Sequence, residues 1–462
     1  MRDWRQSRKP LHRLLFMEVL SCLTGHMLKQ FKRLYKAVDS AFNALTYTVG
    51  DDLAITTTYR QRDEFIILGL VAAIFTSAIL TVAALVAIIG YLIWQGRLKT
   101  VIETVEGANY LLAFCLITFV VSLMNLNLQG VLISFVMCAM FLVSMFIRSV
   151  MTRAFFEKII DISCASSVLG FVVIACQKLV TIQSPEFRAS STFLNANYYG
   201  AITELVVILC LYKMLQPKQR HWQRYLAIAV MNLGGLFLSD CRSAMGALAI
   251  AVLVILLLNK RYRLFGVMLG IEALIVAAVY LAPFILPRID QAGMAFMYRT
   301  SIWQTSIKGI MEHPLFGLGG GSYRMIFARL GGPDEMHAHS LFLDPLLNFG
   351  IVGVIFLAVY YKNNLKSIWN MLKYPQDYQR SSLMAAVLAC VVIHGITDIT
   401  VFSVQTGLLV SVLMGVAGIR ENQPDTEVRT YAGDFWRDKG IRVPQVSAMT
   451  KGRSYISQQP PK

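Results

Sequence analysis

The sequence predicts an all-α polytopic membrane protein, with about twelve transmembrane helices and one large extracytoplasmic loop. Two observations carry this prediction. Hydrophobic residues make up 56% of the chain and charged residues only 15%, and uncharged apolar runs recur from about residue 65 to residue 419. Runs of this length can span a hydrocarbon core about 30 Å thick. We expect no secretory signal, because residues 1–64 are polar and no short basic segment directly precedes the first run.

The candidate transmembrane helices follow the apolar runs in chain order. They are residues 65–94, 109–124, 130–147, 162–180, 198–215, 225–239, 243–259, 264–283, 340–361, 382–397 and 400–419. The first run is too long for one crossing and short for two. We interpret it as a tight hairpin that crosses the membrane twice, since only this choice places the later basic loops on one side.

Charge sets the predicted topology. Residues 1–36 are rich in Lys and Arg, so the N-terminus should stay in the cytoplasm. With a hairpin at 65–94, the later basic stretches also lie inside; these are residues 148–158, 213–224, 260–263 and 362–380. Both termini are then cytoplasmic. The net charge of +16 is explained by these loops, which excludes a nucleic-acid partner.

Three parts of the chain are expected. Residues 1–64 form a basic cytoplasmic extension, 65–419 the membrane domain with an extracytoplasmic loop at 284–339, and 420–462 a cytoplasmic tail that is polar and disordered. Within the extension, Leu11–Val38 mixes apolar and basic residues in a pattern compatible with a helix. This helix either lies on the anionic inner leaflet or is solvated in the cytoplasm, and both readings stay open. Most cysteines sit in apolar runs and resemble small core residues.

The outer face collects arginines, against the usual charge rule. They are Arg188, Arg242, Arg288, Arg299, Arg324 and Arg329. A guanidinium group captures phosphate or carboxylate with two parallel hydrogen bonds. Arg242 stands between two apolar runs with almost no loop, and a charge at that depth is a functional candidate. A simple ion pair with Asp240 is the alternative.

Two further segments on this face carry polar or glycine signals. "HPLFGLGGGSYR", which contains Gly319 and Arg324, lacks the ending of a P-loop. It is either a flexible turn or a run of backbone amides that leads into a short helix at Ser322 and cradles an anion. Asn195 and Asn197 begin the span at 198–215; they either cap that helix or bind sugar hydroxyls.

A histidine pair, His337 and His339, stands just before the run at 340–361. Zinc would need a third ligand. Asp334, Glu335 and Asp344 are near in sequence, but no second His or Cys cluster faces outside. We therefore expect no metal and no cofactor, and favour a base that works near ambient pH beside the arginines.

Several of these stretches together resemble the O-antigen ligase and polymerase superfamily, the Wzy and WaaL type of membrane glycosyltransferases. The resemblance covers roughly residues 65–419 and is strongest in "MYRTSIWQTSIKGIMEHPLFGLGGGSY" and "HAHSLFLDPLLNFGIVGVIFL". An Asn-x-Asn loop and a segment similar to Ser-Arg-Gly stand at the matching places. The sequence departs from the family pattern at two places. Ser340 replaces the Asn that usually follows the histidine, and Cys241–Arg242–Ser243 replaces Ser-Arg-Gly. Neither change removes the histidine or the arginine.

The resemblance implies the chemistry. The essential histidine corresponds to His339, the two key arginines to Arg242 and Arg299, and His337 to a less strict companion. An undecaprenyl-pyrophosphate-linked glycan would be the donor, and a glycan or lipid-core hydroxyl the acceptor. The arginines would neutralise the diphosphate as the anomeric bond breaks. His339 would accept the proton of the incoming hydroxyl, or hold that hydroxyl for in-line attack.

The implied enzyme is therefore a metal-independent inverting glycosyltransferase, and the resemblance implies a bacterial inner (plasma) membrane as its location. Substrate-binding roles are expected for His337, Asn195, Asn197, Arg324 and Gly319. Membrane lipids and a chain-length regulator are further expected partners. The sequence does not separate a polymerase of O-antigen, capsule or exopolysaccharide from an O-antigen ligase. The alternative outside this class is a transporter or flippase for anionic or lipid-linked substrates, although no internal repeat of the transporter kind is visible.

Overall fold

The computed structural model describes residues 52–184, 187–217, 219–282, 291–374 and 377–419. Most of these residues lie in helices, and none of them lies in a strand. Residues 63–431 form one compact unit; a second unit, of residues 1–62 and 432–462, is described only at 52–62. The expectations for Leu11–Val38, for Arg288 and for the tail at 420–462 lie outside the described residues.

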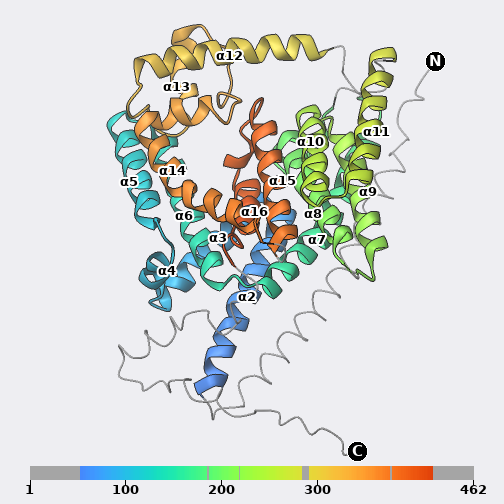
Figure 1. Cartoon of the computed structure of the whole chain (residues 1–462). Helices are drawn as coiled ribbons and strands as arrows, with labels where there is room; N and C mark the ends of the chain where they lie inside the picture. The colour runs from blue at the N-terminus through green and yellow to red at the C-terminus, as the bar shows by residue number, and fades with distance from the viewer. Residues whose placement is uncertain (1–51, 185–186, 218, 283–290, 375–376, 420–462) are drawn as a thin grey trace, which may run out of the picture. The chain divides into compact units, whose positions relative to one another are not determined.

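A helix lies in each predicted apolar run, and the long first run contains two. They are α2 (Asp52–Thr76), α3 (Ala78–Trp94), α5 (Ala108–Met124), α6 (Leu128–Val150), α7 (Arg153–Val180), α8 (Ala196–Leu215), α9 (Trp222–Ser239), α10 (Arg242–Leu258), α11 (Tyr262–Leu281), α14 (Leu343–Met371), α15 (Tyr378–Gly395) and α16 (Val404–Met414). Three more helices are α4 (Leu98–Thr104), α12 (Ala292–Glu312) and α13 (Tyr323–Leu330), and Thr400–Phe402 forms the short helix η4. Figure 1 shows their arrangement.

The chain reverses inside the first apolar run. α2 ends at Thr76, and the side chain of Ser77 accepts a hydrogen bond from the backbone of Ile79 and so caps α3. Asp63 near the start of the run accepts from the hydroxyl of Tyr91, 2.8 Å away, and pairs with Arg97 at 2.8 Å. Because these partners lie at opposite ends of the run in sequence, the chain doubles back within it; that both helices cross the membrane stays a prediction.

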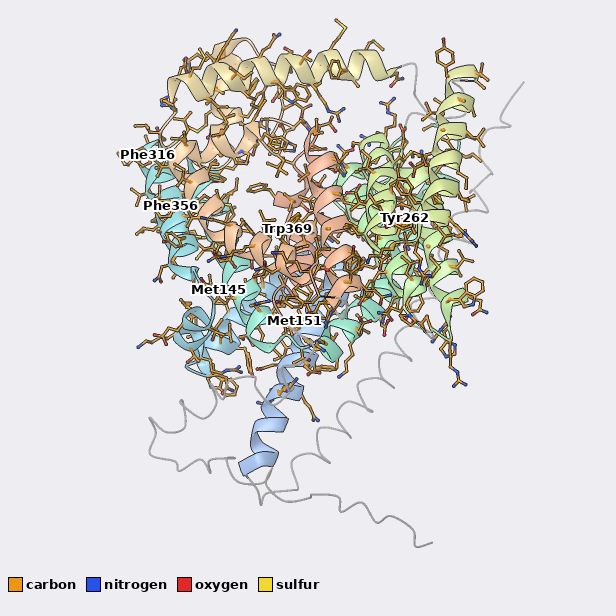
Figure 2. The ribbon with its side chains drawn as sticks, in the orientation of Figure 1. Met145, Met151, Tyr262, Phe316, Phe356 and Trp369 are labelled. Atoms are coloured by element: carbon orange, nitrogen blue, oxygen red, sulfur yellow. The ribbon has the colours of Figure 1, made fainter. Side chains whose placement is uncertain are left out.

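The protein is a membrane protein, although twelve crossings are not confirmed. Among the described residues, 5 helices are long and apolar enough to cross a membrane, or up to 6 if the bent pair α3 and α4 is one span. α11 is apolar, yet none of its residues is buried, so lipid is the environment that fits its surface. Four residues labelled in Figure 2 give the same contrast in exposure: Met145 and Met151 are buried, whereas Tyr262 and Trp369 are exposed.

Two helical segments are broken. α3 and α4 meet at 103°, where Gly96 has a positive φ. α14 kinks at Gly350, whose φ of 61° and ψ of −175° are not helical. A Cβ at Gly350 would lie 2.3 Å from the backbone of Leu315, so the kink also allows the segment before α13 to lie against α14.

The large loop predicted at 284–339 is not confirmed as a loop. Most of its described part is helix, in α12 and α13. In Figure 1, α12 runs across one end of the bundle, over α13 and α14, rather than along it. A short helix at Ser322 was one of the two readings of the sequence, and α13 follows Ser322. The sequence prediction missed α12, because its polar residues exclude a membrane span but do not exclude a helix lying on a surface.

Candidate active site

One pocket gathers side chains from five separate parts of the chain. It encloses about 710 Å³ of space free of protein atoms, including its open mouth. Its lining is Arg188, Asn197, Asp240, Arg242, Ser243, Ala295, Tyr298, Arg299, Ile302, Glu335 and His339. Three predicted catalytic residues, Arg242, Arg299 and His339, thus line the same pocket together with Asn197.

The wall formed by α12 follows helical spacing. Ala295, Tyr298, Arg299 and Ile302 recur at the spacing of one helix face, which turns Arg299 toward the pocket. The same helix also holds the backbone at His339, because Trp303 Nε1 donates a hydrogen bond to the carbonyl of His339 at 3.3 Å. α12 therefore supplies both a cation and a support for His339.

Arg242 is the first residue of α10. Only Asp240 and Cys241 separate it from α9, and Asp240 makes the turn with a left-handed φ of 52°, a conformation that Asp adopts more readily than most residues. No side chain caps the start of α10. Because a helix N-terminus carries partial positive charge, Arg242 and the helix end together favour an anion.

His339 has a carboxylate beside each ring nitrogen. Its Nδ1 lies 3.2 Å from Asp398 Oδ1, and its Nε2 lies 3.5 Å from Glu335 Oε2. Burial alone would lower the pKa of His339, but the hydrogen bonds and charges of Asp398 and Glu335 outweigh it and raise the pKa to about 9. His339 is therefore an imidazolium at neutral pH in this arrangement.

The backbone is held by hydrogen bonds both before and after His339. The preceding residue, Ala338, donates its N–H to Asp344 Oδ1 at 2.8 Å, and Leu341 donates to the carbonyl of Gly395 at 2.7 Å. His339 itself has a φ of 46°, which few residues with a side chain adopt. Strain at one residue persists only when its surroundings fix it, and these contacts do so.

His337 lies behind His339 rather than in the pocket lining. The two rings are 4.2 Å apart between centroids, and His337 Nδ1 accepts from the backbone N–H of His339 at 3.3 Å. Burial and the neighbouring His339 lower the pKa of His337, against the opposing effect of nearby carboxylates. A neutral His337 beside a cationic His339 follows from these shifts.

Asp398 was not singled out in the sequence, because no motif surrounds it. It lies between α15 and η4 and is 1% exposed. Its Oδ1 accepts from the backbone N–H of Ile399 at 2.8 Å, and its Oδ2 accepts from Asn197 Nδ2. His339 lowers the pKa of Asp398 below the ordinary carboxyl range, even though burial opposes this, so the residue is a carboxylate.

Arg188 is a third arginine in the pocket. One of its terminal nitrogens donates to Asn197 Oδ1 at 2.7 Å and to the carbonyl of Asp240 at 3.2 Å. Its Nε is buried without a hydrogen-bond partner among the described residues. Asn197 thus joins Arg188 to Asp398, which gives it a positioning role in addition to its place in the pocket wall.

The remaining predicted binding residues lie outside the pocket lining. Asn195 is exposed and caps α8, where it accepts from the backbone of Tyr198 at 2.9 Å. Arg324 is exposed on α13. Arg329 pairs with Glu312 at the surface, where its Nη1 lies 3.0 Å from Oε1 and its Nη2 contacts Oε2. These placements favour capping for Asn195 and surface roles for the two arginines.

The glycine segment forms a fixed turn. Asn127 donates to the carbonyls of Leu318 and Gly320, at 3.1 and 2.9 Å. The N–H of Gly319 donates to the carbonyl of Asn348, and that of Ser322 to its side-chain oxygen, both at 2.9 Å. These amides are therefore used inside the fold, which does not support an anion cradle at the segment.

A metal ion has one candidate position among the described residues. His337, His339 and Asp398 each offer a ligand atom, and these atoms lie within 4.8 Å of one another. Asp398 supplies the third ligand that the sequence lacked, so the geometry permits zinc. The hydrogen bonds of Asp398 to His339, Ile399 and Asn197 satisfy the same atoms without a metal.

Fold and pocket together define a polytopic helical membrane protein with a cationic pocket at one end of its bundle. Residues 226–358 match the family model described as O-antigen ligase. This match confirms the resemblance to the O-antigen ligase and polymerase superfamily, and it implies a lipid-linked glycan donor and an acceptor. No curated protein matches the chain. The matched segment includes Arg242, Arg299 and His339 but ends before Asp398.

Proposed function

We propose that this protein transfers a glycan from an undecaprenyl-diphosphate carrier to an acceptor sugar hydroxyl at the extracytoplasmic face of a bacterial inner membrane. The observation that carries the proposal is the convergence of Arg242, Arg299 and His339 on one pocket. Three groups that are far apart in sequence supply positive charge to the same space. A leaving diphosphate needs this charge as the anomeric bond breaks.

Each cation in the pocket has a role in this scheme. Arg242 and Arg299 bind the two phosphates with paired hydrogen bonds. Arg188 adds a third guanidinium group whose Nε faces no other partner in the described structure. His339, with its pKa raised to about 9, acts as an imidazolium that stabilises the leaving group; it could act as a base only after losing a proton.

Carboxylates and amides complete the donor site. Asp398 orients His339 through Nδ1 and Asn197 through its amide, in the manner of the acid in a catalytic triad. Glu335 lies next to the other ring nitrogen of His339, Nε2. When the diphosphate binds and His339 turns toward it, the carboxylate of Glu335 accepts hydrogen bonds from sugar hydroxyls. A single in-line displacement then gives inversion at the anomeric carbon, and the arginines supply the electrostatic stabilisation without a metal.

The proposed topology has twelve crossings with both termini in the cytoplasm. The reversal at Ser77 supports it, because the hairpin returns the chain to the side on which it began. The basic loops then follow the positive-inside rule, and the pocket under α12 faces outward. This orientation suits a donor whose glycan has already crossed the membrane.

A transfer assay tests the proposal. Purified full-length protein in lipid nanodiscs is mixed with undecaprenyl-diphosphate-linked oligosaccharide extracted from host membranes, and with the glycolipid fraction of the same membranes as acceptor. We expect chain extension or ligation, release of undecaprenyl diphosphate, and neither in Arg299→Ala. If reconstituted vesicles move the lipid-linked donor between leaflets without any transfer, the protein is instead a flippase.

A further inference from the structure

A second histidine–carboxylate pair lies beneath the pocket. His394 Nε2 is 3.2 Å from the hydroxyl of Ser243, and His394 Nδ1 is 3.1 Å from Glu204 Oε1. The order hydroxyl, imidazole, carboxylate is that of a catalytic triad, which is recognised by geometry and not by chain order. Three helices contribute, since Ser243 lies on α10, His394 on α15 and Glu204 on α8.

Only the hydroxyl end of this chain of hydrogen bonds reaches the pocket. Ser243 lines the pocket beside Arg242, whereas His394 is 0% and Glu204 2% exposed. Water therefore reaches neither the imidazole nor the carboxylate directly, and Ser243 is the member of this chain that takes a proton from the pocket side. The thiol of Cys241, which also contacts His394, is itself buried and lies 3.6 Å from Ser243 Oγ. In a place with little water, each charge interaction is also stronger than at the surface.

The surroundings of His394 stabilise the imidazolium that forms when its ring takes up a proton. It lies in the last turn of α15, where the carbonyl end of a helix stabilises a cation. Glu204 faces it directly, and the other carboxyl oxygen, Oε2, is buried without a hydrogen-bond partner among the described residues. A proton gained by His394 therefore forms an ion pair with Glu204.

The two histidines near the pocket differ in what their ring nitrogens face. Both nitrogens of His339 face carboxylates, so neither is turned toward an incoming hydroxyl. His394 has one carboxylate, at Nδ1, and the hydroxyl of Ser243 at Nε2. With Nδ1–H donated to Glu204, the lone pair of Nε2 accepts the Ser243 proton, and Ser243 Oγ can accept another proton from the pocket side.

We propose that Ser243, His394 and Glu204 form a proton relay that takes up the proton of the attacking acceptor hydroxyl; this rests on the proposed function. As the acceptor oxygen bonds to the anomeric carbon, its proton passes to Ser243 Oγ and the Ser243 proton passes to His394 Nε2. The bond between the anomeric carbon and the diphosphate oxygen breaks, and the diphosphate leaves as an anion. Ser243 ends as a hydroxyl, and His394 ends as an imidazolium paired with Glu204.

The transfer assay described above tests the relay when it is combined with a binding measurement. We expect Ser243→Ala to lower kcat on the order of 10²-fold, the usual range for losing proton transfer, while binding undecaprenyl diphosphate as well as wild type does. Ser243→Thr keeps a hydroxyl and should stay within about tenfold of wild type. Glu204→Gln keeps an acceptor for His394 but removes the charge, and it should lower kcat with unchanged carrier binding.

Ser239→Ala is the matched control. Ser239 is also buried next to this turn, but its hydroxyl donates only to the carbonyl of Leu236, 2.7 Å away. It should leave kcat unchanged. Rates in mixtures of H₂O and D₂O give a readout that a merely structural role would not move: the dependence should be curved for wild type, because two protons move together, and linear for Ser243→Ala.

Two results would overturn the relay while leaving the proposed function intact. One is a Ser243→Ala enzyme that transfers glycan at the wild-type rate. The other is a glycosylated Ser243 peptide in acid-quenched wild-type reactions, which would make Ser243 a nucleophile and the reaction a double displacement. A wild-type protein that binds the carrier but transfers no glycan would instead overturn the proposed function, and the relay with it.

Discussion

Asp398 and His339 lie side by side although 59 residues separate them in the chain, with Asp398 Oδ1 3.2 Å from His339 Nδ1. The carboxylate is 1% exposed, and it also accepts from Asn197. One residue of a short turn therefore links the histidine segment to the start of α8. It fixes both the orientation and the charge of His339, and the first prediction concerns this charge.

Activity should depend on pH through His339. The pKa of His339 is raised from 6.5 to about 9, so the cation is present at neutral pH and is lost as pH rises through about 9. If the cation stabilises the leaving diphosphate, kcat/KM falls over that range. The same ionisation adds stability that is fully present below pH 6.5 and lost through about 9. A rate that rises through pH 9 would show that neutral His339 is the base.

Asp398→Asn should move this pH dependence. The amide keeps a hydrogen-bonding group beside His339 but removes the negative charge that raises its pKa. We expect the fall in kcat/KM to begin at lower pH than in wild type, with a loss at pH 7 on the order of 10-fold or more. Glu335→Gln is the companion variant and should give a smaller shift in the same direction. A pH profile identical to wild type in Asp398→Asn would contradict the role given to this residue.

The pocket arginines should not tolerate lysine. Arg242→Lys and Arg299→Lys keep the charge but cannot make a paired contact to phosphate. Each should lose on the order of 10²-fold in kcat/KM, as when one donor to a developing anion is removed. Arg329→Lys is the matched control, because Arg329 pairs with Glu312 at the surface. Equal tolerance at all three positions would mean that the pocket arginines only contact lipid headgroups.

The histidine pair separates the metal-free mechanism from a zinc site. We expect His339→Ala to leave folded, membrane-inserted protein with a transfer rate lowered by roughly 10²-fold or more, and His337→Ala to retain part of the activity, because His337 lies behind His339. With zinc on His337, His339 and Asp398, both substitutions fail alike. The measurements are transfer rates with and without chelator, together with the metal content of the purified protein. Activity that a chelator abolishes and zinc restores would refute the metal-free mechanism.

Gly319→Ala tests whether the glycine segment is structural. A Cβ at Gly319 would lie 2.1 Å from Ser122 Oγ, and its φ is +92°. Gly331 also has a positive φ, +71°, but a Cβ there meets nothing within 4 Å. Gly331→Ala therefore carries only the backbone cost, about 1 kcal/mol, and Gly319→Ala adds the clash. We expect a lower midpoint of thermal unfolding for Gly319→Ala than for Gly331→Ala. If Gly319→Ala unfolds like Gly331→Ala but loses donor binding, the segment binds substrate.

Topology can be tested with single cysteines in a cysteine-free background. Met311 on α12 and Trp369 near the end of α14 are both exposed, so both can react if reagent reaches them. In intact cells, a membrane-impermeant maleimide should label Met311→Cys and leave Trp369→Cys unlabelled until the membrane is permeabilised. Labelling of Trp369→Cys from outside would overturn the proposed topology and the outward orientation of the pocket.

The sequence by itself determined the helices that lie in the apolar runs and the class of the protein. Helix formation in an apolar run is a local matter, since each backbone group finds its partner within the same segment. The candidate transmembrane helices therefore matched observed helices. Arg242 and His339 also stood out in the sequence, because a charge or histidine beside an apolar run is costly. Arg299 was identified through the resemblance to the O-antigen ligase and polymerase superfamily.

The tertiary structure alone decided which residues share the pocket. Asp398, Arg188 and the chain from Ser243 through His394 to Glu204 meet only because α8, α10, α15 and the segment after α15 pack together. No spacing in the sequence encodes these contacts, since their partners come from different helices. Asn195 and Asn197 show the limit most clearly. They are two residues apart and alike in chemistry, but they point in different directions at the start of α8. Asn195 is an exposed cap, whereas Asn197 lies between Arg188 and Asp398.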